Sequence, residues 1–124
     1  MQQTGNKLAI GGAEAARRFG FTTQVSSQSV FLTDGPSRKY RLGNHEVRLK
    51  RVAPRKVALA GRPAGEALSA LWYLGSDEVT PQTFEQIEGR LPPEEFSFLT
   101  HKQEIMPGWM HSALSEYQKE RQVA

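Results

Sequence analysis

The sequence of 124 residues has no cysteine, which excludes disulfide bonds, thiol catalysis and cysteine-ligated zinc. It also has no apolar run close to the roughly 20 residues that a membrane-spanning helix needs. Its first residues, 1–12, lack the charged and apolar regions of a signal peptide. Together these absences predict a soluble, cytoplasmic protein without a membrane partner.

Motifs for metal, phosphate or nucleophile chemistry are also missing. The three histidines, His45, His101 and His111, lie far apart, so a metal site would have to be assembled in space. Gly11-Gly12 lacks the further glycines and the lysine of a phosphate-binding loop, and there is no Gly-x-Ser-x-Gly motif. We therefore predict no metal and no cofactor.

Acidic residues are scarce in the first half of the chain. Residues 1–61 contain eleven Lys or Arg and three acids, whereas residues 62–124 contain five and ten, and the net charge is only +3. A basic first half predicts a surface for nucleic acid or for an acidic protein. The basic half of one copy could also attract the acidic half of another, so a homo-oligomer is a further possibility.

Two turn signals divide a segment of alternating apolar and polar residues. Asp34-Gly35-Pro36-Ser37 and Gly43-Asn44 are turn sequences, and the runs around them alternate with a period of two. This pattern predicts a three-stranded antiparallel β-meander over residues 29–53. Residues 21–28 are polar and compatible with a loop or with a short edge strand, which would be the fourth. Pro54 ends the sheet.

The alternation predicts one apolar face for the sheet and one basic face. We expect Phe31 and Tyr40 to pack in the core rather than to stack on bases. Half of the positive charge falls in this region and supplies the candidate binding residues: Arg38, Lys39, Arg41, Arg48, Lys50, Arg51, Arg55 and Lys56. They can neutralise phosphates or an acidic partner. Alternatively, they only keep an exposed sheet soluble.

Helical patterns surround the sheet. A short helix is predicted over residues 12–19, where Gly20 can end it. A helical part over residues 63–120 begins with a segment that ends at Gly75 and that we expect to cover the apolar sheet face. Further helices are predicted from Thr80, over residues 94–105, and after Pro107. Residues 1–124 are thus predicted to form a single α+β domain.

One enzymatic alternative rests on three residues. A metal-dependent nuclease needs carboxylates that hold a divalent cation and a lysine near the scissile phosphate. Asp34, Glu46 and Lys50 imitate such a set, although aspartate also has a local role in a turn. The alternative to a binding module is therefore a small metal-dependent nuclease that uses these side chains.

Four segments of the chain resemble the C-terminal region of AbiEi-type antitoxins, which belong to type IV toxin-antitoxin systems. The segments are residues 19–25, 30–38, 42–47 and 51–55, within a resemblance that covers roughly residues 8–91. The residues that match the family motif are Thr23, Gln24, Thr33, Asp34, Gly35 and Arg38.

The resemblance implies a module of antitoxicity or transcriptional regulation. Family members usually carry an N-terminal winged helix-turn-helix, for which the residues before Gly11 are too few. It also implies a functional link to a nucleotidyltransferase-like toxin, without a stable complex. With the basic face, we predict a non-enzymatic, antitoxin-like or regulatory module that contacts nucleic acid or an acidic protein. A stand-alone protein-interaction domain is a further alternative.

Overall fold

The computed structural model describes residues 6–25 and 28–123, with residue 123 described by its backbone alone. In chain order, the elements are β1 (Leu8–Ile10), α1 (Gly12–Arg18), β2 (Gln28–Thr33), β3 (Arg38–Leu42), β4 (His45–Arg51), η1 (Pro54–Val57), α2 (Pro63–Leu74), α3 (Pro81–Arg90), α4 (Pro93–Thr100), η2 (Gln103–Ile105) and α5 (Gly108–Val123). The predicted α+β class is confirmed.

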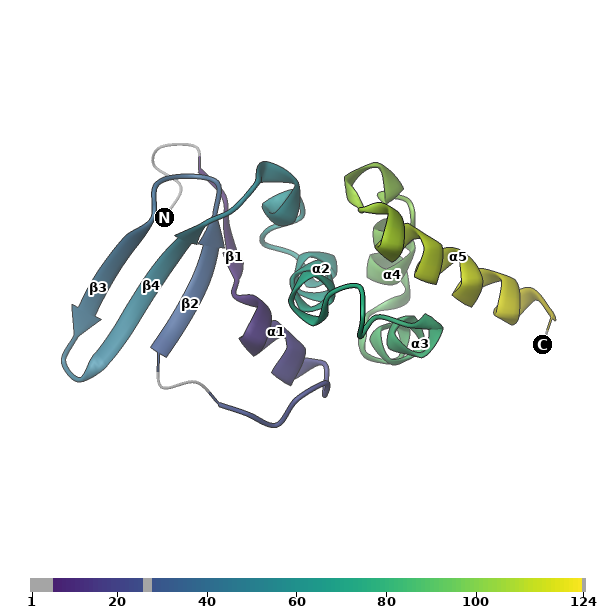
Figure 1. Ribbon diagram of the computed structural model, residues 1–124, viewed down its shortest axis with the longest axis horizontal. Helices are drawn as coiled ribbons and strands as arrows, with labels where there is room; N and C mark the ends of the chain where they lie inside the picture. Colours follow the sequence, from purple (N-terminus) through teal and green to yellow (C-terminus); the bar gives the residue numbers. More distant parts are fainter. Residues whose placement is uncertain (1–5, 26–27, 124) are drawn as a thin grey trace.

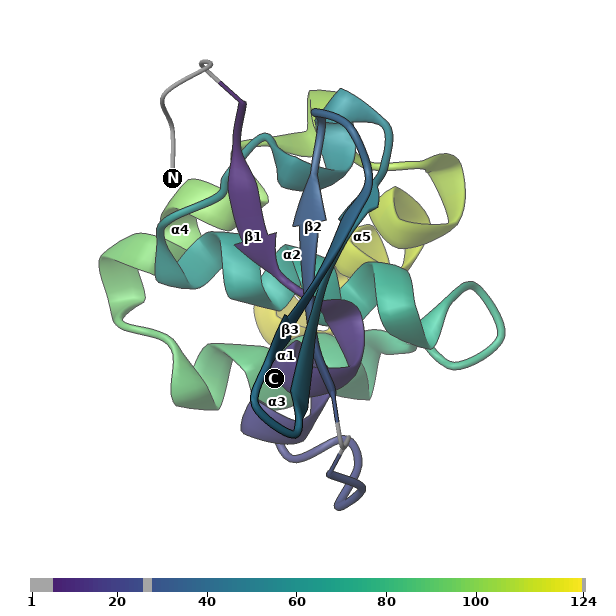
Figure 2. The ribbon, with the colours of Figure 1, turned by 90° about the vertical axis from the view of Figure 1, so that its left-hand side faces the viewer.

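The sheet and the helices lie side by side along the molecule (Figure 1). The strand β1 lies beside α1 and α2, while β3 is the strand farthest from the helices. Seen from the sheet end, β3 and β4 lie in front of the helices (Figure 2). The β3–β4 hairpin is therefore an exposed end of the molecule.

The sheet is mixed, with the order β1-β2-β4-β3, and the predicted antiparallel meander is wrong in this respect. The hairpin of β3 and β4 is antiparallel as predicted, with Tyr40 opposite Val47. However, β4 also pairs in parallel with β2, so that Phe31 lies opposite Leu49. Consecutive strands β2 and β3 are thus separated by β4.

Hydrogen bonds around the turn after β2 explain this order. The Val52 amide donates to the Thr33 carbonyl at 2.8 Å, and the Arg51 amide donates to Ser37 Oγ at 3.0 Å. The end of β4 is thereby held between the end of β2 and the start of β3. Burial favours the same order, because β4 contributes two half-buried apolar residues, whereas all five residues of β3 are exposed and suit an edge.

The fourth strand comes from a segment that the sequence did not indicate. Residues 21–25 form no strand, and residues 26–27 of the predicted edge strand are outside the described part of the chain. The outer strand is instead β1, which pairs antiparallel with β2 and places Ala9 opposite Leu32. A strand of three residues is too short to show a period in the sequence.

Helix starts agree well with the capping signals. The helix α3 follows Thr80, whose amide donates to Thr83 Oγ1 at 3.0 Å, and α5 follows Pro107. The predicted helix over residues 94–105 is two elements, since α4 ends at Thr100 and η2 follows. At this break, the hydroxyl of Thr100 donates to the Ser97 carbonyl at 2.9 Å and competes with the helical bonds.

The main core lies among the helices rather than beneath the sheet. Its fully buried side chains include Leu68, Leu71, Phe84, Ile87, Leu99, Met110 and Leu114. A smaller cluster of Ala9, Leu32 and Val57 joins one face of the sheet to η1. None of the helices in the described part of the chain has the length and apolarity that crossing a bilayer requires.

The expected cover of the apolar sheet face by α2 is also wrong. The helix packs against α1, β1 and η1, so it meets the sheet at its β1 edge. Tyr40, which we expected in the core, is 45% exposed, and Phe31 is only half-buried. Most of the apolar face therefore remains open.

A close backbone contact fixes the start of α2 and gives a stability test. A Cβ atom added at Gly65 would lie 2.1 Å from the Leu59 carbonyl oxygen, whereas one at Gly89 of α3 would meet nothing within 4 Å. We expect Gly65→Ala to lower the free energy of unfolding by about 1 to 3 kcal/mol through overpacking. Gly89→Ala should raise it by about 0.5 to 1 kcal/mol. Urea denaturation measures both, and a stabilised Gly65→Ala protein would contradict the close packing.

Candidate functional site

Strand register sorts the predicted binding residues onto two faces of the sheet. Neighbours across the strands share a face, as do residues two apart along a strand. Lys39 lies opposite Arg48, and Arg41 lies opposite Glu46. These residues therefore share one face with Lys50, and all four cations are exposed. We call Lys39, Arg41, Arg48 and Lys50 the basic face.

The basic face has much more positive than negative charge. Glu46 is its acid, and the Lys39 Nζ atom lies 3.8 Å from Glu46 Oε2. Lys39 and Arg48 are direct cross-strand neighbours of the same sign, an arrangement that destabilises a sheet in isolation. Among the described residues, Arg41, Arg48 and Lys50 form no ion pair. An anionic partner would reduce the repulsion among the cations of the basic face.

The other four predicted cations are not among these strand residues: two lie on the opposite face of the sheet and two lie in η1. Arg38 and Arg51 occupy the opposite face, since they pair in register with Leu49 and Thr33. The side chains of Arg55 and Lys56 in η1 lie over the ring of Trp72, 5.1 and 4.5 Å from its centroid respectively. Those two cations are thus partly engaged in cation–π contacts.

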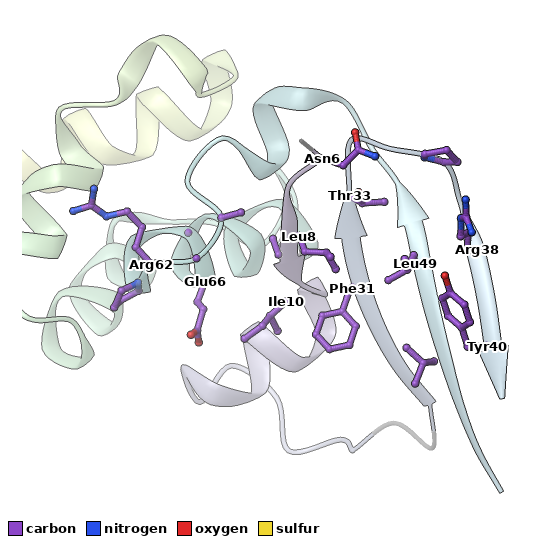
Figure 3. A pocket seen from close by; sticks show the side chains of 17 residues that line it. Asn6, Leu8, Ile10, Phe31, Thr33, Arg38, Tyr40, Leu49, Arg62 and Glu66 are labelled. Carbon is purple, nitrogen blue, oxygen red and sulfur yellow. The ribbon is translucent and has the colours of Figure 1, made fainter. Parts of the chain in front are cut away.

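The opposite face of the sheet forms a groove that sequence reasoning missed. It has a volume of about 980 Å³ and lies between the strands and the start of α2 (Figure 3). Its floor, which we call the apolar floor, consists of Leu8, Ile10, Phe31, Tyr40, Val47 and Leu49. The alternation placed Tyr40, Val47 and Leu49 in strands, but it could not indicate that β1 adds Leu8 and Ile10 to this face or that no helix covers it.

Charged residues border the groove on both sides. Arg38 borders it on β3, and among the described residues no acid pairs with this guanidinium. On the α2 side, the Glu66 carboxylate accepts from Arg18 Nη1 at 3.3 Å. Arg62 Nη2 donates to Glu95 Oε2 at 2.9 Å, and this contact holds the pKa of Glu95 below its ordinary value. The unpaired charge at the groove is therefore positive.

Three of the motif residues build the turn after β2. Thr33 is buried, and its Oγ1 accepts from the Gly35 amide at 3.0 Å. Asp34 Oδ1 accepts from the Lys7 amide at 2.9 Å and thereby joins the turn to the start of β1. Gly35 is buried against Asn6, where a Cβ atom would lie 2.2 Å from the amide nitrogen of that side chain. The contacts of all three are structural.

The remaining motif residues lie elsewhere. Arg38 borders the groove, as described above. Thr23 and Gln24 are exposed after α1, where the Gln24 amide donates to Thr22 Oγ1 at 3.2 Å. The motif residues therefore do not converge on one site.

The structure does not bring the proposed nuclease residues together. The parallel register pairs Glu46 with Gln28 at one end of β2, while Asp34 follows the other end. Six residues of strand separate these positions by about 20 Å. Glu46 and Lys50 share a face four residues apart. No group of three or more His, Asp or Glu side chains in the described part of the chain could hold a metal ion.

The histidines have separate local contacts. His45 Nε2 lies 2.7 Å from Ser29 Oγ, His101 Nδ1 lies 2.7 Å from the Ser97 carbonyl oxygen, and His111 Nε2 lies 2.6 Å from Gln103 Oε1. Each is a hydrogen bond to a neighbouring polar group, and the three rings share no site.

Comparison with known proteins identifies a family but no function. The model of DUF6088, described as a family of unknown function, matches residues 5–97. The searches of curated proteins and of solved structures find no match. The matched range includes the whole sheet and reaches into α4. The resemblance to AbiEi-type antitoxins remains a prediction.

Removal of the Asp34 carboxylate tests whether the motif is structural. We expect Asp34→Ala to lower the free energy of unfolding by about 1 kcal/mol, because the Lys7 amide loses its acceptor. The exposed Asp77, whose side chain forms no hydrogen bond or ion pair with the described residues, provides the control, and Asp77→Ala should change stability by less than about 0.5 kcal/mol. Chemical denaturation measures both variants. Equal stability of Asp34→Ala and the wild type would contradict the structural role.

Proposed function

The chain belongs to DUF6088, a family of unknown function, and from the charge on its surface we propose that it is a non-enzymatic nucleic-acid-binding module. The basic face of the β3–β4 hairpin makes the contact. The observation that carries the proposal is the gathering of Lys39, Arg41, Arg48 and Lys50 on one face, with a single acid among them.

The chemistry of this face suits a phosphate backbone. Each Lys or Arg that neutralises a phosphate releases counterions, and this gain supplies most sequence-independent affinity. The repulsion between Lys39 and Arg48 is relieved in the same step. The hairpin lies at the end of the molecule away from the helices, so a long polymer can approach it without a clash with α2 to α5 (Figure 1).

The composition of the basic face favours nucleic acid over an acidic protein. Stable protein interfaces have an apolar core with aromatic anchors and a polar rim. On the β3–β4 hairpin, the aromatic Tyr40 and the apolar Val47 and Leu49 belong to the opposite face. The basic face therefore offers charge without an anchor, which suits binding through phosphates.

The same surface and the resemblance to AbiEi-type antitoxins together support a proposed regulatory role. A sequence-independent contact can add affinity to a module that reads an operator, or can retain the protein on nucleic acid near its target. We therefore propose an antitoxin-like or regulatory module with a functional link to a nucleotidyltransferase-like toxin. The structural contacts of Thr33, Asp34 and Gly35 support a role without catalysis.

Charge reversal on the basic face tests the proposal. We expect Arg48→Glu to weaken binding of a labelled DNA duplex and of a structured RNA by roughly tenfold, because one phosphate contact is lost and one repulsion is added. The slope of log affinity against log salt should fall by about one. Fluorescence anisotropy at several salt concentrations, with and without magnesium, measures both quantities.

The matched control is Lys119→Glu, which makes the same change of charge on an exposed residue of α5, at the far end of the molecule. Its binding should stay within about twofold of the wild type, since a Debye length of about 10 Å screens the distant charge. Equal losses in both variants would show an effect of net charge and would contradict the proposed face. Magnesium-dependent cleavage would contradict the non-enzymatic role.

A further inference from the structure

The groove on the other face of the sheet is a second surface with different chemistry. A sheet with an apolar face normally buries it against a helix or another sheet. Here the apolar floor remains half-buried, Tyr40 is 45% exposed, and Leu42 on the same side of β3 is 67% exposed. Exposed apolar residues that adjoin in this way mark interaction sites.

We propose that this groove binds an amphipathic, acidic α-helix of a partner protein. The floor spans four strands, or about 14 Å from β1 to β3, at the spacing of neighbouring strands. A helix with its side chains is about 10 to 12 Å wide. The groove therefore has the width of one helix. A helix bound there would cover the sheet face that α2 leaves exposed.

The unpaired positive charge beside the groove favours a helix with acidic side chains. Arg38 borders the groove, and Arg51 lies on the same face in register with Thr33, while neither pairs with an acid of the described chain. Glu66 on the opposite wall is engaged by Arg18, and Glu95 is engaged by Arg62. Acidic side chains on the edge of the helix that faces β3 would meet Arg38 and Arg51, while its apolar side chains pack on the floor.

Two other occupants fit the groove less well. A second copy of this chain, placed on the same face by a two-fold axis, would bring the Arg38 side chains of both copies into one interface. A small amphiphile would have its charge beside Arg38 but would leave much of its surface in water. Sites for small ligands bury about 70 to 90% of the surface of the ligand, whereas Tyr40 in the floor of this groove is itself 45% exposed.

Selection from a library of displayed helical peptides tests the proposal without a known partner. Each peptide has about 18 residues, or about 27 Å of helix, with fixed apolar residues at helical spacing and random flanking positions. Against the wild-type chain, we expect enrichment of Asp and Glu at the flanks. The most enriched peptide is then synthesised, and its affinity is measured by fluorescence anisotropy.

Two single variants on one strand identify the face. Arg38→Glu and Arg41→Glu make the same change of charge on exposed residues of β3, but on opposite faces. We expect Arg38→Glu to weaken the selected acidic peptide by at least about tenfold, and Arg41→Glu to leave its affinity within about twofold. Tyr40→Ser should also weaken it, through loss of the floor. Nucleic-acid binding should depend on Arg41 instead, so that either proposal can be refuted without the other.

Several results would overturn the inference. These are the absence of any enriched peptide, enrichment of neutral or basic flanks, and equal losses for Arg38→Glu and Arg41→Glu. Sedimentation that shows a dimer of the wild type, lost in Tyr40→Ser, would make a second copy the occupant. Displacement of the peptide by dodecanoate at equal concentration would assign the groove to a small amphiphile.

Discussion

The insertion of β4 between β2 and β3 is the constraint on which the sheet depends. It is fixed at one end of the strands by two hydrogen bonds, in which the Arg51 amide donates to Ser37 Oγ and the Val52 amide donates to the Thr33 carbonyl. The same turn binds the start of β1 through Asp34. One short loop therefore joins all four strands, and it contains three of the motif residues, Thr33, Asp34 and Gly35.

This strand order gives the hairpin two unlike faces. Strand β3 is an edge, so both sides of it can meet solvent or a partner. Along β3, successive basic residues alternate between the faces, with Lys39 and Arg41 on one face and Arg38 on the other. The first face has charge without apolar anchors, whereas the second has apolar residues with Arg38 and Arg51 beside them. They suit partners of different chemistry.

The open groove arises from the way the helices meet the sheet. The contact between Gly65 and the Leu59 carbonyl brings the start of α2 close to the chain that leaves η1. From there, α2 runs beside α1 and β1 and joins the helical core through Leu68 and Leu71. Because the helices form their own core, little of the sheet has to be covered for the chain to fold. The apolar face is free for another molecule.

Local signals along the chain were sufficient to predict several features of this fold. Thr80, Pro107 and Gly75 predicted helix ends correctly, because caps act within one turn. Gly43 predicted the β3–β4 hairpin, and its φ of 62° is the conformation that glycine adopts readily. The alternation also placed Lys39, Arg41, Arg48 and Lys50 on one face, since a strand has a fixed period of two.

Which strands are neighbours and which face of the sheet is covered depend instead on contacts between distant segments. The pairing of β2 with β4 joins residues that are 18 positions apart, such as Phe31 and Leu49, and no local signal encodes such a bond. The short β1 becomes a strand only because β2 offers it a partner. The groove depends on where α2 lies, which is set by the packing of the helices on each other rather than by the pattern of the strands.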